Sequence, residues 1–227
     1  SLPSITIICA FKFAWDLLEK QSEVETLKST IQESELQFLK SQINPHFLFN
    51  NLNNIYALSI ENSPRTSEMI LELSAFLRYM LYECKARYVP LSREIDQLNN
   101  FIHLSQMQIE GRGTVNVQID NIKSGYQIAP LILMVFVENA FKHSSSSQVD
   151  QIYIQIKIWM TDDDKLHFQC KNNYLDQSNV HDLSQGIGLE NVKKRLDLIY
   201  PNAHKLRISQ DVGKFEVDLT ILLNQTQ

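Results

Sequence analysis

A histidine and an asparagine stand four residues apart in the segment INPHFLFNN, as His46 and Asn50. Four residues span about 6 Å of an α-helix, so in a helix these two side chains would share one face. A neutral imidazole can act as a nucleophile near pH 7, which few other side chains do without help. Pro45 removes a backbone donor and is expected to bend the helix beside this histidine. Taken alone, the segment favours a structural or surface histidine, and a nucleophilic histidine is the alternative.

Four polar residues follow an almost wholly apolar run in the segment VENAFKHS: Glu138, Asn139, Lys142 and His143. They form two pairs of residues four apart, which predicts two polar pairs on neighbouring faces of one helix. An amide oxygen is a hard ligand suited to Mg²⁺, and lysine or histidine can bind phosphate oxygens. The pattern fits a site for a cation and a phosphate. It fits equally well a solvated helix end, where the helix dipole favours cations.

Two further segments carry weaker signals. In QGIGLENVKKRL, Gly186 and Gly188 precede or open a helix, where a close backbone approach and exposed amides suit a phosphate. A flexible hinge before an amphipathic helix is the alternative. In CKNNY, Asn172 and Asn173 end a predicted strand, and their amides either bind the edge of a base or form a turn.

Hydrophobic periodicity predicts the helices that position these residues. A polar stretch from Trp15 carries apolar residues at intervals of seven, which indicates a weak coiled coil or a packed single helix; these are Leu17, Val24, Ile31 and Phe38. The helical pattern continues through Ile60, and a second helix over 66–85 would complete an antiparallel hairpin. A third helix is expected from Leu91, capped near Ser92 and ended by the glycines of 111–113.

Beyond residue 113 the pattern changes to alternating apolar and polar residues rich in β-branched types, which predicts about five strands. They are expected at 114–120, 151–160, 165–170, 205–209 and 214–223. Two helices lie between them, at 130–144 with Pro130 in the first turn and at 188–200, while the serines of 144–147 are expected in a loop. This order predicts an α+β fold in which helices cover one face of a mixed sheet.

Composition restricts the class of protein. The 227 residues are 44% hydrophobic and 21% charged, as in an ordinary globular chain. The formal net charge is −5 and no basic cluster stands out, so nucleic acid is not expected as a partner. The three cysteines, Cys9, Cys84 and Cys170, have no paired spacing, which indicates neither a disulfide framework nor a zinc site and favours a reducing compartment.

The first fifteen residues are apolar but are interrupted by Lys12 and are too short to cross a bilayer. They are expected to be the remnant of a membrane-proximal or transmembrane segment. A buried helical start is the alternative.

Taken together and in order, NPHFLFN, ENAFKH, NN and GIGLENVKKRL resemble the LytS-type sensor histidine kinases, two-component kinases whose ATP-binding domain has the GHKL fold. The resemblance covers roughly residues 36–223. It implies that residues 16–87 form a coiled coil and a helical hairpin that dimerises as a four-helix bundle and carries the phosphoacceptor. Residues 88–227 would then form the ATP-binding catalytic domain.

The resemblance also implies a role for each candidate residue. His46 matches the phosphoacceptor, and Asn50 matches an amide position that related kinases use to place water for dephosphorylating their partner. Asn139 matches the Mg²⁺ ligand of the ATP site, and Glu138 matches a neighbouring glutamate that can assist as a base. The other matches concern the nucleotide: Lys142 and His143 at the phosphates, Asn172 at the adenine, and Gly186 and Gly188 at the edge of the lid over ATP.

Two positions depart from the wider kinase pattern. Many kinases carry DxGxG where this chain has CKNNYLDQ, so Asn172 stands where an aspartate would bind the adenine amino group. Its carbonyl can still accept one hydrogen bond, without the negative charge. Phe47 follows His46 where other branches carry an acidic residue, so the base that acts on the imidazole is Glu138 or solvent.

The implied protein is the cytoplasmic part of a cell-membrane sensor that lacks its N-terminal sensor portion here. As a homodimer it would use Mg·ATP to phosphorylate His46 and pass the phosphoryl group to an aspartate of a response regulator receiver domain. One alternative is a degenerate nucleotide-binding dimeric scaffold or a response regulator phosphatase acting through Asn50. Another is a GHKL ATPase that drives a conformational cycle, against which the hairpin bearing His46 argues.

Overall fold

The computed structural model describes residues 45–109, 111–146, 151–173 and 187–225, together with positions 12, 15, 18–21 and 25. By its internal contacts the chain divides into two compact units, residues 1–48 and residues 49–227. The expected heptad positions Leu17, Val24, Ile31 and Phe38 lie outside the described residues, as does Gly186. The same holds for the chain just before Pro45, where a bend was expected. A domain boundary after residue 87 stays a prediction.

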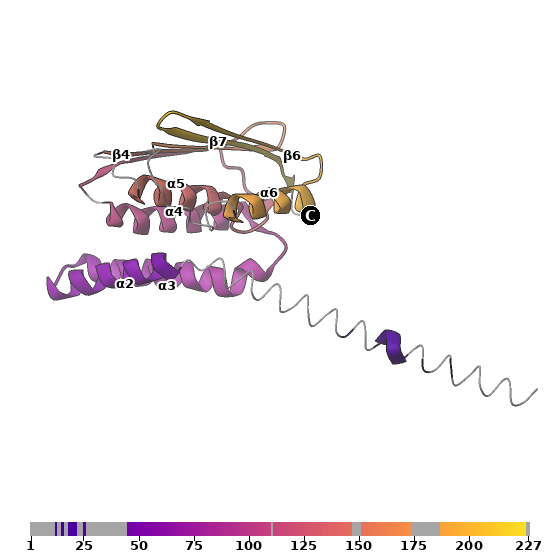
Figure 1. Cartoon of the computed structure of the whole chain (residues 1–227), viewed down its shortest axis with the longest axis horizontal. Coiled ribbons are helices and arrows are strands. Elements are labelled where there is room, and N and C mark those ends of the chain that lie inside the picture. Colours follow the sequence, from indigo (N-terminus) through magenta and orange to yellow (C-terminus); the bar gives the residue numbers. More distant parts are fainter. Residues whose placement is uncertain are drawn as a thin grey trace, which may run out of the picture. The chain divides into compact units, whose positions relative to one another are not determined.

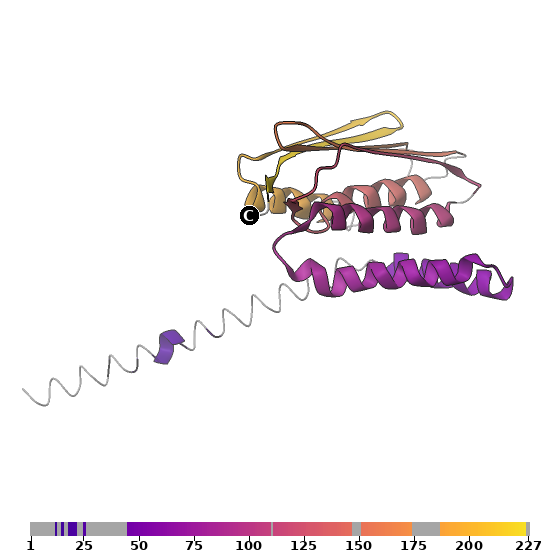
Figure 2. The ribbon, with the colours of Figure 1, turned by 180° about the vertical axis from the view of Figure 1, so that it is seen from behind.

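Two helices follow one another at the start of the continuous part. Helix α2 spans Pro45–Ile60 and helix α3 spans Arg65–Tyr82, close to the predicted ranges. Between them Asn62 has a positive φ of 53°, and the amide of Ser63 donates to the carbonyl of Leu58 at 2.9 Å, which closes the turn. Helix α3 therefore runs back in the opposite direction to α2 (Figures 1 and 2). The last predicted turn of the second helix is a separate 3-10 helix, Glu83–Lys85 (η1).

Helix α4 spans Leu91–Gln108 and buries an apolar face that includes Leu98, Phe101 and Leu104. The predicted cap near Ser92 is wrong, because the helix begins one residue earlier and Pro90 is its N-cap. The proline ring fixes φ at −56° and no side chain caps the first turn. After the helix, Gly111 takes a φ of +77° and the chain enters the sheet.

Five strands form one mixed sheet in the order β2-β4-β5-β7-β6. Their bounds are Gly113–Asp120 (β2), Ile152–Met160 (β4), Lys165–Asn173 (β5), His204–Asp211 (β6) and Lys214–Leu222 (β7). Strands β2 and β4 are parallel, since the chain between them crosses over through a helix, and the other neighbours are antiparallel. All five predicted strands are confirmed.

Helices α5, Ile132–Ser146, and α6, Ile187–Ile199, cover one face of this sheet, and α4 packs against α5 (Figures 1 and 2). Their apolar sides meet the inward residues of the strands, as in the contact of the Phe136 and Phe168 rings at 5.8 Å. The predicted α+β layer sandwich is confirmed. The expected first-turn position of Pro130 is wrong, because Pro130 and Leu131 form a turn before α5 in which Leu131 has a φ of 62°.

A second, small sheet was not predicted. It contains Val89–Pro90 (β1), Tyr126–Ile128 (β3) and Asn224–Gln225 (β8), with β3 in the middle. Strands of two or three residues are too short to show a periodic pattern. This sheet joins the start of α4, the chain before α5 and the last described residues.

Candidate functional site

The second half of α5 carries polar side chains on the part of the helix that the sheet does not cover. Ala140 and Phe141 are buried, whereas the two residues before them and the two after them are half-buried: Glu138, Asn139, Lys142 and His143. Burial, with the charge of Lys142 as a smaller cause, lowers the pKa of His143 from its usual value. The imidazole of His143 is therefore neutral at pH 7 and can donate or accept a hydrogen bond.

The end of α5 is tied to the end of β5 by Ser144, which was expected in a loop and instead lies in the helix. The hydroxyl of Ser144 donates to the carbonyl of Asn173 at 2.8 Å. The Nδ2 group of Asn172 donates to the same hydroxyl oxygen at 3.2 Å and to the Asn173 carbonyl at 3.2 Å. Residues 28 or 29 apart in sequence thus hold the polar half of α5 beside the last residues of β5.

The other amide atom of Asn172, Oδ1, is a buried acceptor for which the described part of the structure provides no donor. The side chain of Asn172 is 3% exposed. The hydrogen bonds fix which amide atom of Asn172 is the oxygen. Because the Ser144 hydroxyl donates its proton to the Asn173 carbonyl, its oxygen can only accept from the Nδ2 group of Asn172. A buried acceptor without a partner is costly and rare in a folded protein. Asn172 therefore fits a site for a ligand that donates a hydrogen bond.

Asn173 has a different role from its neighbour. Its Oδ1 accepts from the amide of Tyr153 at 2.8 Å, and its Nδ2 donates to the carbonyl of Gln151 at 2.7 Å. Both amide atoms are used to close the pairing between β4 and β5. Asn173 therefore neither forms a turn nor has an amide available to bind the edge of a base.

The start of α6 lies beside α5. A Cβ atom placed on the exposed Gly188 would lie 4.0 Å from Cγ1 of Val135, an ordinary van der Waals contact. Because Asn139 is one helical turn after Val135, the beginning of α6 and the polar half of α5 lie near one another. The amides of the first turn of α6 have no partner within that helix and suit an anion. Packing alone does not demand glycine at this position.

These residues fit a magnesium ion that is bound by few protein atoms. Among the described residues no group of three histidine, cysteine, aspartate or glutamate side chains could hold a metal. Mg²⁺ is usually bound through one or two protein oxygens together with substrate phosphates and water. The amide oxygen of Asn139 suits that arrangement, whereas a cage formed by the protein alone does not.

The structure thus brings together six predicted site residues within the second unit: Glu138, Asn139, Lys142, His143, Asn172 and Gly188. His46 lies in the first turn of α2, in the unit of residues 1–48, and Asn50 follows it by four residues in the same helix. That His46 comes close to these six residues stays a prediction.

Sequence reasoning missed a largely buried polar cluster at the turn before α5, which contains Tyr79, Glu94, Arg195 and Tyr200. A signal for it existed. Glu94 falls between Leu91 and Leu98 at the three- and four-residue spacing of the buried face of α4, and a carboxylate on such a face requires partners.

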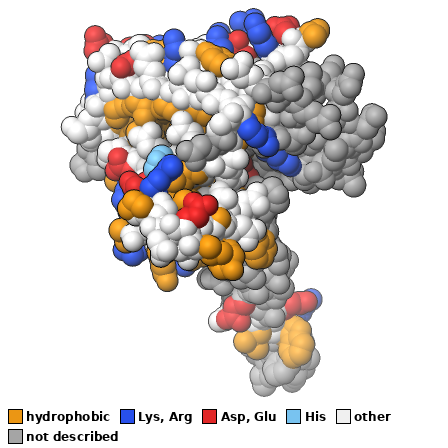
Figure 3. All heavy atoms as spheres, turned by 90° about the vertical axis from the view of Figure 1, so that its left-hand side faces the viewer, with side chains coloured by type: hydrophobic (Ala, Val, Ile, Leu, Met, Phe, Trp, Pro, Cys, Tyr) orange, Lys and Arg blue, Asp and Glu red, His pale blue; other side chains and the backbone are white. Residues whose placement is uncertain are grey.

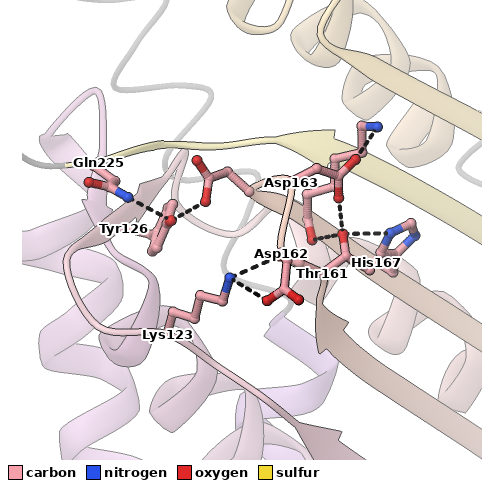
Figure 4. Close-up of polar contacts among 9 residues, drawn as sticks. Lys123, Tyr126, Thr161, Asp162, Asp163, His167 and Gln225 are labelled. Carbon is pink, nitrogen blue, oxygen red and sulfur yellow. Dashed lines mark hydrogen bonds and ion pairs between the residues drawn. The ribbon is translucent and has the colours of Figure 1, made fainter.

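A second polar cluster lies at the other end of β5, around the turn after β4 (Figure 4). Lys123 donates to the carbonyl of Thr161 and pairs with Asp162, both at 3.2 Å. The hydroxyl of Tyr126 donates to Asp164 and accepts from Gln225 at 2.8 Å. These bonds join the loop before β3, the turn between β4 and β5, and the last strand. The cluster holds chain segments together.

The comparisons with known proteins agree with this arrangement. The histidine kinase family model matches residues 34–113. The sensor protein LytS of Bacillus subtilis is 28% identical over 215 residues, which cover 89% of this chain and 36% of that protein. LytS of Staphylococcus saprophyticus is 30% identical over 209 residues, which cover 88% of this chain and 35% of that protein.

The chain is thus similar to the LytS-type sensor histidine kinases over most of its own length. It spans about a third of the length of these LytS relatives. A Staphylococcus aureus relative, 28% identical over 82% of this chain, is named a sensor histidine kinase/phosphatase LytS. The histidine kinase domain of a blue-light activated kinase from Erythrobacter litoralis aligns with a TM-score of 0.43 and 14% identity, covering 72% of this chain and 82% of that domain.

The match to the histidine kinase family model covers α2, α3 and α4 and ends where β2 begins. The segments ENAFKH, NN and GIGL lie beyond it, in the part that the LytS relatives also match. Within the described residues, no helix combines the length and apolar character needed to cross a membrane.

Proposed function

We propose that this chain is the kinase part of a two-component sensor, which uses Mg·ATP to phosphorylate His46 and then transfers the phosphoryl group to an aspartate of a response regulator. The observation that carries this proposal is the buried Oδ1 of Asn172 beside the polar half of α5, an acceptor that has no donor among the residues that the structure describes. The match of residues 34–113 to the histidine kinase family model and the similarity to LytS sensor proteins support it independently.

Asn172 would recognise the adenine. The 6-amino group of adenine is a hydrogen-bond donor, and the Oδ1 atom of Asn172 is the buried acceptor that lacks one. An amide replaces the carboxylate found in many kinases, so this bond is a neutral one. It still discriminates against guanine, which presents an oxygen at the corresponding position.

The phosphates would lie between α5 and the start of α6. Lys142 and the neutral imidazole of His143 can donate to phosphate oxygens, and the backbone amides from Gly186 to Gly188 can bind a further one. Asn139 would hold Mg²⁺, whose charge neutralises the charge that develops on the phosphate oxygens.

The phosphoryl transfer needs a nucleophile and a proton acceptor. The lone pair of an imidazole nitrogen of His46 attacks the γ phosphorus, and the bond to the bridging oxygen breaks so that ADP leaves with that electron pair. The phosphorylated ring then carries an extra proton on its other nitrogen, which passes to Glu138 or to solvent. Catalysis is mostly positioning and charge neutralisation, so the two units must come together for the step.

The helical hairpin would dimerise. Helix α2 exposes an apolar stripe at spacings of three and four residues, made of Phe49, Leu52, Tyr56 and Ile60, and α3 exposes Ile70, Leu71, Leu81 and Tyr82. Figure 3 shows hydrophobic side chains at the surface of this hairpin among charged ones. Stripes of this kind are buried when two hairpins form a four-helix bundle. Residues 16–87 would thus dimerise and present His46, and residues 88–227 would bind ATP.

The length of the relatives and the apolar first fifteen residues favour the cytoplasmic part of a cell-membrane sensor, with the sensor portion preceding this sequence. One further activity is favoured by a specific observation. Asn50 follows His46 by one helical turn, and the Staphylococcus aureus relative is named a kinase/phosphatase. An amide at that place could position water to dephosphorylate the response regulator.

The test is incubation of the chain with γ-labelled Mg·ATP, followed by mapping of a phosphate that is labile to acid and stable to base. His46→Gln should abolish this label while leaving binding of a fluorescent ATP analogue unchanged. Label that survives the substitution would defeat the assignment of His46. Binding without any label in the unaltered chain would favour the scaffold or phosphatase, and released phosphate without phosphoprotein would favour an ATPase.

A further inference from the structure

Three side chains hold three consecutive residues of the turn that leads into α5. The amide of Ala129 donates to the hydroxyl of Tyr200 at 2.7 Å, and the amide of Leu131 donates to Oε2 of Glu94 at 3.0 Å. Between them, the carbonyl of Pro130 accepts from Nη1 of Arg195 at 2.7 Å. Since Leu131 takes a left-handed φ of 62°, this turn is one that its surroundings must hold in place.

The three side chains connect the two helices of the proposed nucleotide site. The turn fixes where α5 begins, and α5 carries Glu138 and Asn139. Arg195 lies in α6, about two turns after Gly188. A bond from Arg195 to the start of α5 therefore sets how α5 and α6 lie relative to one another.

Helix α3 enters the same cluster through one residue. The hydroxyl of Tyr79 donates to Oε2 of Glu94, the oxygen that also accepts from Leu131. Tyr79 and Glu94 are both fully buried. Removing one donor from a buried carboxylate is costly, so the position of α3 and the position of the turn are energetically linked.

We propose that Tyr79 and Glu94 are positioning residues, through which helix α3 sets the placement of α5 and α6 and so the affinity of the site for ATP. The proposal rests on the function proposed above and adds the route by which the hairpin controls the nucleotide site. A displacement of α3 that withdraws the Tyr79 hydroxyl weakens the hold of Glu94 on Leu131. Conversely, a nucleotide that fixes α5 and α6 favours the position of α3 seen here, because such coupling is reciprocal.

The charge of Glu94 gives this link a measurable signature. Burial raises its pKa, opposed by the hydrogen bonds from Tyr79 and Leu131 and by the charge of Arg195. The other titratable groups around the cluster are Cys84 and Glu83 in η1 and Tyr200 after α6, and burial raises the pKa of Cys84 and of Tyr200 to about 12, so both stay neutral at pH 7. The hydrogen bond from the Tyr79 hydroxyl favours the ionised form of the Glu94 carboxyl, so loss of that hydroxyl raises the pKa of Glu94 further. Glu94 then takes up its proton at a higher pH.

The experiment measures the dissociation constant of a fluorescent ATP analogue with Mg²⁺ for the whole chain, from about pH 5.5 to about pH 8.5, roughly 1.5 units on each side of neutrality. Tyr79→Phe should weaken binding about tenfold at pH 7, within the range typical of coupling between sites. Its loss of affinity on acidification should begin at a higher pH than in the unaltered chain. Glu94→Gln should weaken binding without that dependence on pH.

Two control variants separate positioning from stability. Ser67→Ala removes a hydroxyl from an exposed position of the same helix and should leave binding unchanged. Leu73→Val, at a buried position of α3 outside the cluster, should lower the melting temperature and leave the affinity unchanged. The proposal is overturned if Tyr79→Phe binds as tightly as the unaltered chain throughout the pH range, or if Leu73→Val weakens binding equally at a matched loss of stability.

A second measurement is independent of the nucleotide. Hydrogen exchange of the amides of residues 129–135 should become faster in Tyr79→Phe and not in Ser67→Ala. Equal exchange in both variants would overturn the link from α3 to the turn. Failure of the unaltered chain to bind the analogue, with faster exchange in Tyr79→Phe, would instead defeat the proposed function and leave the mechanical link supported.

Discussion

The two ends of strand β5 differ in how their polar groups are satisfied. At its start, the turn between β4 and β5 joins Lys123, Tyr126 and Gln225 through hydrogen bonds and ion pairs among protein groups (Figure 4). At its other end, Asn172 is buried and keeps an acceptor without a donor among the described residues. The strand has nine residues, so the two places are about 27 Å apart.

This difference distinguishes a structural cluster from a candidate site. Polar groups that satisfy each other stabilise the fold and have little left to offer a ligand. A buried acceptor kept unsatisfied costs stability, and a ligand that supplies the missing donor recovers that cost. Predictions that separate nucleotide binding from stability at the two ends of β5 therefore test the whole interpretation.

The largest effect is expected from Asn139→Asp. The new carboxylate would repel phosphate oxygens and would lose the donor capacity of the amide. Binding of Mg·ATP should weaken roughly 100-fold, about 2.8 kcal/mol. Titration of a fluorescent ATP analogue with Mg²⁺ measures this, and the dimer population from analytical ultracentrifugation should stay unchanged. Equal losses of nucleotide binding and of dimerisation would argue against a metal ligand at this position.

A smaller and more specific effect is expected from Asn172→Leu. Leucine keeps the volume of the buried side chain but has no acceptor, so ATP binding should weaken about tenfold, the value of one hydrogen bond of about 1.4 kcal/mol. The preference for ATP over GTP should fall by the same factor, which competition binding measures. The melting temperature should change little, because leucine leaves no cavity and the substitution removes an unsatisfied buried polar group.

Ser144→Ala is the matched control for this variant. It removes one of the two acceptors of the Nδ2 group of Asn172 and leaves the Oδ1 atom in place. It should lower stability while keeping the preference for ATP. A preference that survives in Asn172→Leu and disappears in Ser144→Ala would show that Oδ1 of Asn172 does not bind the base.

The strands that carry these groups were predictable, whereas the pairings between the groups were not. Ile152, Ile154, Ile156 and Ile158 alternate with polar residues, a local pattern that any strand with one buried face must show. The helical placement of Ser144 depends on Asn172 and Asn173, nearly thirty residues later. Local composition, a run of serines, indicated a loop instead. Contacts between residues so far apart in the sequence form only once the sheet has packed, and a short segment of sequence does not reveal them.

The same holds for Glu94. Its place on the apolar face of α4 can be seen in the spacing, but its partners Tyr79 and Leu131 lie 15 residues before it and 37 after it. The small sheet of β1, β3 and β8 was missed because its strands are shorter than one period of any pattern. The sequence thus predicted the helices, the five long strands and the motif residues. It did not predict the hydrogen bonds between buried polar groups that are far apart in the sequence.

The smallest effect on nucleotide binding is expected at the start of β5, from Tyr126→Phe. This removes a hydroxyl that donates to Asp164 and accepts from Gln225 while it keeps the buried ring. The free energy of unfolding should fall by about 1 to 2 kcal/mol, as expected for one lost bond to a charged group. Binding of the ATP analogue should not change. Denaturant unfolding and the same titration measure the two quantities, with Tyr82→Phe as the exposed control. A weakened nucleotide affinity without a loss of stability would contradict the division between a structural end and a binding end of β5, because it would mean that a fully satisfied cluster about 27 Å away acts on the site.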